Sequence, residues 1–195
     1  MNCQSLKTKI KSLSENFKNN KNAVVICNET WFKTRDPQLK KILVDLEDEE
    51  EVVALRKDRK QGKRGLAHGG VAVFFDRTKC NLKKIPLNAL RGQENRDFEI
   101  LAARGNLSGV KRELVVFSCY LPPSLGRAQA ERIIEALTDA ISEAKAKANS
   151  PWMIIAGDWD KHKTDLITNT FPDLTVRQTA PTRGLATLDL SLIHI

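Results

Sequence analysis

The sequence lacks the features of a membrane-spanning, secreted or zinc-binding protein. No stretch approaches the roughly 20 apolar residues of a transmembrane helix, and the N-terminus has no apolar signal-peptide core. There is no C-x-x-C pair and hence no zinc spacing. The four cysteines lie far apart in the sequence, at Cys3, Cys27, Cys80 and Cys119. We therefore expect an intracellular, reducing environment and no membrane partner.

The chain also lacks internal repeats and low-complexity segments. Its 195 residues fit one medium-sized domain, which can bury a core without disulfides or metals. The net charge of +8 suits an anionic partner such as nucleic acid. Charge alone does not identify that partner, because ribosomal proteins and heparin binders have a similar balance.

Apolar runs alternate with amphipathic segments along the chain. Leu6, Ile10, Leu13 and Phe17 have the spacing of a helix that begins near Ser5, and a second helix of five or six turns is predicted from Ala130 to about Asn149. This alternation predicts a layered α/β domain. The predicted strands are 23–28, 71–75, 98–104, 113–120 and 152–156.

Two neighbouring segments have opposite charge. The chain is acidic from Asp45 to Glu51 and basic from Arg56 to Arg64. We interpret them as a solvated loop or strand pair, with a dedicated DNA contact as the alternative.

Three of the predicted strands end in a residue suited to phosphate chemistry: Glu29, Tyr120 and Asp158. Singly, each is more typical of a turn, a cap or simple packing. Together they match the needs of phosphodiester hydrolysis. Glu29 can bind a hard cation, Asp158 can orient or deprotonate water, and Tyr120 can donate a hydrogen bond to a phosphate oxygen.

Seven motifs in order resemble the endonuclease/exonuclease/phosphatase superfamily, and specifically the apurinic-endonuclease-like domain of non-LTR retrotransposons. The resemblance covers nearly the whole chain. It implies a deoxyribonuclease-like two-sheet α/β sandwich flanked by helices, incomplete here at both ends. The motifs are Asn2, Glu29-Thr30-Trp31, Gly69-Gly70-Val71, Tyr120-Leu121-Pro122-Pro123, Gly157-Asp158-Trp159-Asp160, Pro181-Thr182-Arg183-Gly184 and Leu188-Asp189-Leu190.

The resemblance also implies roles for the matching residues. Glu29 would be the main metal ligand for Mg²⁺ or Mn²⁺, and Asn2 would help to position it. Tyr120 would contact the scissile phosphate, Asp158 would act on the nucleophilic water, and Asp189 would orient a catalytic histidine. The remaining residues assigned to phosphate or DNA binding are Thr182, Arg183 and Trp159. For Trp159, local packing is the alternative to base stacking.

The C-terminal segment departs from the family pattern. Relatives continue to a Ser-Asp-His motif whose histidine is central to catalysis, and His194 is no substitute because it follows Asp189 by only five residues. Residues 190–195 are also the in-frame translation of the sequencing adapter CTGTCTCTTATACACATC. We therefore assign 1–189 to a truncated domain and 190–195 to a non-native tail, a hypothesis that resequencing of the locus tests.

The N-terminal segment departs as well, since relatives have a hydrophobic strand before the asparagine and here only Met1 precedes Asn2. The other two histidines, His68 and His162, are interpreted as exposed loop residues.

The function that we predict is a metal-dependent endonuclease that nicks DNA for retrotransposition, impaired in this copy. The resemblance implies a nuclear location, chromosomal DNA as partner and a reverse transcriptase domain further along the full-length polyprotein. No obligate oligomer is implied. The alternatives are a phosphatase of the same superfamily, acting on phosphoinositides or sphingomyelin, and an inactive remnant that only binds nucleic acid through charge.

One departure yields a direct test. The family has asparagine where this chain has Asp160, and an ionised carboxylate cannot donate a hydrogen bond to the phosphate or the nucleophile. Asp160→Asn, in a chain extended through a Ser-Asp-His motif, should raise plasmid nicking by roughly tenfold or more. An unchanged or lower rate would contradict this interpretation.

Overall fold

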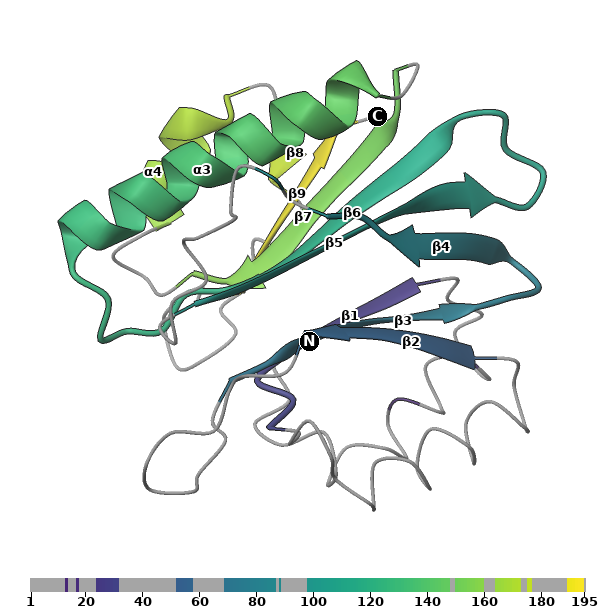
Figure 1. The fold of residues 1–195 in the computed structure, drawn as a ribbon, viewed down its shortest axis with the longest axis horizontal. Helices are drawn as coiled ribbons and strands as arrows, with labels where there is room; N and C mark the ends of the chain where they lie inside the picture. The colour runs from purple at the N-terminus through teal and green to yellow at the C-terminus, as the bar shows by residue number, and fades with distance from the viewer. Residues whose placement is uncertain are drawn as a thin grey trace.

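Two β-sheets pack face to face, and helices cover the outer face of the larger one (Figure 1). In this computed structural model, the described residues are 13, 17, 24–31, 52–57, 69–86, 88, 98–147, 150–159, 164–172, 175–176 and 189–194, with the backbone alone for 176 and 189–194.

The smaller sheet has the strand order β1-β3-β2, with both neighbours antiparallel to the central strand. Its strands are β1 (Val24–Asn28), β2 (Val52–Lys57) and β3 (Val71–Asp76). Every residue of β3 is buried, because alternate side chains face the larger sheet and an outer cluster. Leu13 and Phe17, from the predicted N-terminal helix, are helical and buried in that outer cluster. The rest of that helix lies outside the described residues.

The larger sheet has the order β4-β5-β6-β7-β9-β8. Among its described strands, β6 and β7 are the pair that runs in parallel, since the helix α3 (Arg127–Ala146) carries the chain back between them. A shorter helix, α4 (Thr164–Thr170), packs beside α3. The strands are β4 (Cys80–Lys84), β5 (Glu99–Leu107), β6 (Glu113–Tyr120), β7 (Trp152–Asp158), β8 (Thr175–Val176) and β9 (Asp189–His194).

The predicted α/β sandwich is confirmed, with small shifts at element ends. The strand predicted over 113–120 is found without change, and the predicted long helix begins three residues earlier, at Arg127. The basic segment that starts at Arg56 contributes its first two residues to β2, and residues 58–64 and the acidic segment 45–51 lie outside the described residues. Residues 190–194 lie in β9, whose backbone pairs with β7; the non-native origin of 190–195 stays a prediction.

None of the helices in the described part of the chain has the length and apolar character to cross a bilayer.

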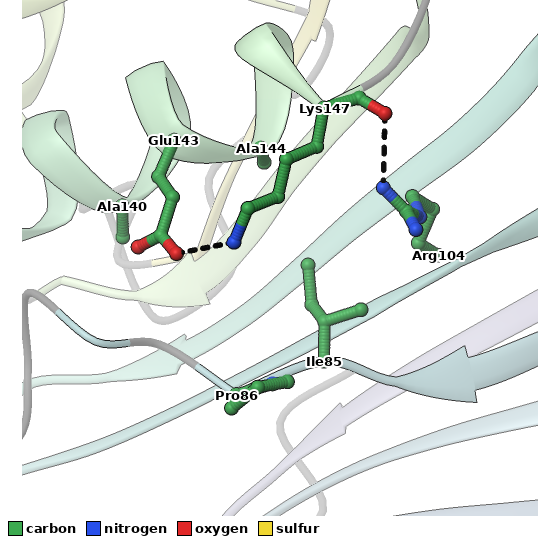
Figure 2. Close-up of a pocket in the computed structure, with 7 residues that line it drawn as sticks. All are labelled: Ile85, Pro86, Arg104, Ala140, Glu143, Ala144 and Lys147. Atoms are coloured by element: carbon green, nitrogen blue, oxygen red, sulfur yellow. Dashed lines mark hydrogen bonds and ion pairs between the residues drawn. The ribbon is translucent and has the colours of Figure 1, made fainter.

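A small pocket of about 120 Å³ lies under the C-terminal end of α3 (Figure 2). There Arg104 of β5 donates a hydrogen bond to the Lys147 carbonyl, 3.3 Å away, and Lys147 bonds Glu143 one turn earlier. The hydrogen bond from Lys147 lowers the pKa of Glu143 below its ordinary value. Asn88 donates a further hydrogen bond to Glu143. These contacts satisfy an end carbonyl of the helix and fasten the helix to the sheet.

Gly157 allows β7 to pass close to β6. A Cβ at this position would lie 2.6 Å from the Cys119 carbonyl oxygen and 2.9 Å from Trp159 Cε2. Real contacts of this kind are longer, and the carbonyl is backbone in a paired strand, so it cannot move without disturbing the sheet.

We therefore expect Gly157→Ala to lower the free energy of unfolding by about 2 kcal/mol or more, by overpacking. Urea denaturation measures the difference. Gly126→Ala is the matched control, because its added methyl group meets no atom within 4 Å and its φ of −65° suits alanine. It should cost at most about 1 kcal/mol. Equal effects of the two substitutions would contradict the argument.

Candidate active site

Strand pairing places several polar residues in one row across the larger sheet, where β6 and β7 end and β5 and β9 begin. Glu99 pairs with Tyr120, Tyr120 with Asp158, and the backbone of Asp158 with that of Asp189. Directly paired residues share a face of a sheet. Because Tyr120 belongs to the core between the two sheets, Glu99 and Asp158 also face the smaller sheet. All three are at least nine-tenths buried.

Glu29 reaches this row from the smaller sheet through a strained turn. It follows the last residue of β1 and has a φ of +53°, which L-residues with side chains rarely adopt. Thr30 and Trp31 then bond the carbonyls of Gly70 and Gly69, at 3.3 and 2.9 Å. Both glycines have positive φ, of 88° and 107°, so other residues would be strained there. Such strain is a feature of functional sites.

A hydrogen bond joins the two sheets at this point. The Tyr120 hydroxyl donates to Glu29 Oε1 at 2.9 Å. The other carboxylate oxygen, Oε2, is buried and has no hydrogen-bond partner among the described residues. A buried carboxylate oxygen without a partner is costly, so this atom is a candidate ligand for a cation.

Asn28 makes a second link between the sheets. Its side-chain amide lies 3.2 Å from both Ser118 Oγ and the Cys119 carbonyl oxygen, and 3.1 Å from the Asp158 nitrogen. A carbonyl oxygen only accepts and a backbone N–H only donates. All neighbours are therefore satisfied when Nδ2 donates to Cys119 and Ser118 and Oδ1 accepts from Asp158. In the reverse orientation, Ser118 would bond Oδ1 but the Cys119 carbonyl would face an oxygen.

The carbonyl of Asp158 is fixed too. It accepts a hydrogen bond of 2.9 Å from the Leu121 N–H, directly after β6. On the opposite face of β6 lies Cys119, and its complete burial raises the pKa of its thiol above the ordinary value. This thiol therefore stays neutral beneath the row and adds no charge to it.

The structure brings together Glu29, Tyr120 and Asp158, the three residues that were predicted because each lies at the end of a predicted strand. The backbone of Asp189 lies beside Asp158, and its role stays a prediction. Outside the described residues lie the predicted site residues Asn2, Asp160, Thr182 and Arg183 and the loop histidines His68 and His162.

Trp159 lies in the core and away from any surface where a base could stack. Its side chain has no exposed area and packs in the cluster between α3 and the larger sheet. The DNA-binding role assigned to it has no accessible face in this structure, and local packing describes it instead.

His194 lies at the other end of the sheet from Asp158. It pairs with Met153, five residues before Asp158 on β7, which corresponds to about 17 Å along a strand. This placement agrees with its rejection as a substitute for the catalytic histidine.

Three polar residues of this region were not singled out from the sequence: Asn28, Glu99 and Ser118. Each lies in or at the end of an apolar strand and is at most 3% exposed. Buried polar groups need partners, so a polar residue within a buried run is a signal that could have identified them.

The sequence matches no protein-family model and no curated protein. The fold, in contrast, matches many solved structures. An endonuclease/exonuclease/phosphatase protein from Bacteroides vulgatus aligns over 96% of this chain and 79% of its own, with a TM-score of 0.68 and 11% identity. The catalytic domain of human Nocturnin aligns over 96% and 74%, with a TM-score of 0.61 and 16% identity.

Another similar structure is D. rerio TDP2 complexed with a single-strand DNA product (TM-score 0.60, 12% identity, 96% of this chain and 77% of that one). At such low identity the likeness concerns the fold alone. The chain therefore has the two-sheet α/β sandwich fold of endonuclease/exonuclease/phosphatase proteins.

The bond between Tyr120 and Glu29 can be tested on its own. We expect a double-mutant cycle of Tyr120→Phe and Glu29→Ala, followed by urea denaturation, to give a coupling energy of about 1 to 2 kcal/mol, since the bond is buried and its acceptor is a carboxylate oxygen. Pairing Tyr120→Phe with Glu113→Ala, on the same strand but partly exposed, should give no coupling. Additive effects of the first pair would contradict the observed contact.

Proposed function

We propose that this protein is a metal-dependent phosphodiester hydrolase that nicks DNA. The observation that supports it best is the hydrogen bond between Tyr120 and Glu29 beside the end of β7, where Asp158 lies. This arrangement gathers two carboxylates and a phenol from both sheets. Such a set can bind a cation, orient water and donate a hydrogen bond to a phosphate oxygen.

The donor set at Glu29 fits a divalent cation such as Mg²⁺ or Mn²⁺. Its Oε2 atom is buried and lacks a hydrogen-bond partner among the described residues. Those residues contain no cluster of three or more His, Cys, Asp or Glu side chains that would form a complete protein cage. Mg²⁺ suits such a site, because it is usually bound by one or two carboxylates and keeps several waters. When bound, the cation would neutralise charge on the phosphate.

The protein's own groups would then divide the remaining tasks. Asp158 would hold or deprotonate the attacking water, its position fixed by backbone bonds on both sides. The Tyr120 hydroxyl, which now bonds Glu29, would donate to a phosphate oxygen. Asp189 would orient a catalytic histidine supplied by a Ser-Asp-His segment. By family resemblance alone, the further residues proposed are Asn2 near the metal, Thr182 and Arg183 on the phosphate, and Asp160 in place of the usual asparagine.

DNA is the substrate that we favour over a small phosphate ester. The net charge of +8 attracts a polyanion, and the Pro181-Thr182-Arg183-Gly184 segment resembles the retrotransposon endonucleases. On this proposal the protein acts on chromosomal DNA in the nucleus, next to a reverse transcriptase domain of the same polyprotein. The rival is a phosphatase, because a Bacteroides thetaiotaomicron mannosyl-6-phosphatase has a similar fold (TM-score 0.65, 10% identity, 97% of this chain and 78% of that one).

A supercoiled-plasmid assay tests the proposal. With Mg²⁺ and a chain extended through Ser-Asp-His, we expect nicked circles, and Glu29→Ala should lower the rate by at least about 100-fold through loss of the metal ligand. Glu131→Ala, an exposed glutamate on α3, is the matched control and should change little. Release of phosphate from phosphoinositides or sugar phosphates without nicking would favour the phosphatase.

Salt-sensitive DNA binding with neither activity would favour the inactive remnant. Nicking that is unchanged in Glu29→Ala would overturn the assignment of the site.

A further inference from the structure

We propose that Asn28 is a positioning residue, whose side-chain amide sets the placement of Glu29 relative to Asp158. This inference rests on the proposed function for its chemical meaning, but the geometry stands without it. Asn28 is the last residue of β1, is 2% exposed, and directly precedes Glu29 in the chain. Its side chain faces the larger sheet, where it forms hydrogen bonds with the ends of β6 and β7.

The amide is suited to this task because it both donates and accepts. Nδ2 donates to the Cys119 carbonyl and to Ser118 Oγ, each at 3.2 Å, and Oδ1 accepts from the Asp158 N–H at 3.1 Å. One planar group thus contacts two adjacent strands of the larger sheet at once. Hydrogen bonds in a buried, low-dielectric place are strong and directional, so the three contacts resist sliding of β1 along β6 and β7.

The contacts of Asn28 lie next to both chemical groups. The bond to Asp158 is made by the backbone of that residue, so it acts on the position of the carboxylate and not on its charge. On the other side, one peptide unit separates Asn28 from Glu29, whose φ of +53° is a strained value. A strained turn persists only when its surroundings fix it. Asn28 supplies that restraint on the strand side, as the bonds of Thr30 and Trp31 to Gly70 and Gly69 do on the loop side.

Tyr120 serves as a separate reporter, because the Asn28 amide contacts Ser118, Cys119 and Asp158, whereas the Tyr120 hydroxyl donates to Glu29. The chain contains a single tyrosine, so tyrosine labelled with ¹³C at Cζ gives one NMR signal. That signal responds to the hydrogen bond from Tyr120 to Glu29 Oε1. A group that only filled space at position 28 would leave the signal unchanged as long as the protein stayed folded.

The test compares Asn28→Ala and Asn28→Asp in the 195-residue chain, with Asn106→Ala as matched control on an exposed position of β5. We expect Asn28→Ala to shift or broaden the Tyr120 signal and to weaken binding of Mn²⁺ alone, measured by water-proton relaxation, by roughly tenfold or more. Asn28→Asp keeps an acceptor for the Asp158 N–H but loses both donors. It should give a smaller signal shift, and Asn106→Ala none.

Folded Asn28→Ala with an unchanged Tyr120 signal and unchanged Mn²⁺ affinity would overturn the proposal. If that variant does not fold, as judged by circular dichroism, the same two measurements on Asn28→Asp decide in its place, since Asn28→Asp retains part of the hydrogen bonding. Glu29→Gln confirms that the signal reports on the carboxylate. Failure of the proposed function is distinguishable: the parent chain would then bind no Mn²⁺, while Asn28→Ala would still shift the Tyr120 signal.

Discussion

The hydrogen bonds that join the ends of β1, β6 and β7 are the constraint on which the rest of the site depends. Each sheet is held by its own backbone ladder, but the contact between sheets consists mainly of apolar side chains such as Val73 and Val116. Apolar burial stabilises without direction, so it permits small shifts of one sheet over the other. The polar contacts of Asn28 and Glu29 with β6 and β7 are directional, and they fix that relation.

The backbone and side chains at this contact between the two sheets are also strained. Glu29 and Trp31 both have a φ of 53°, and a carboxylate oxygen of Glu29 is buried without a partner among the described residues. Each feature costs free energy, and neither improves packing. A protein selected only for stability would avoid both. Their occurrence together, at the point where the two sheets meet, is what the proposed binding of a cation by Glu29 would require.

The sequence predicted those strands whose burial is evident from a continuous run of apolar residues. Continuous apolar runs such as that of β7 identify strands covered on both faces, and Glu29, Tyr120 and Asp158 were found because each follows or ends such a run. The edge strand β4 escaped prediction, because it is short and carries two exposed lysines. The role of Asn28 was missed for a different reason. Its partners are about 90 to 130 residues away in the chain, and no linear pattern encodes the register between two sheets.

Opposite ends of the same strand hold the helix α3 and the polar row. On β5, Glu99 lies in the polar row while Arg104, five residues on, fastens the C-terminal end of α3 through Lys147. That distance is about 17 Å of paired strand. Because a paired strand in the middle of a sheet bends little, fastening α3 at one end also holds the row of Glu99, Tyr120 and Asp158 at the other. The long helix packs on the face of the larger sheet opposite to this row and thus supports it from behind, so the row can carry strain because its scaffold is secured elsewhere.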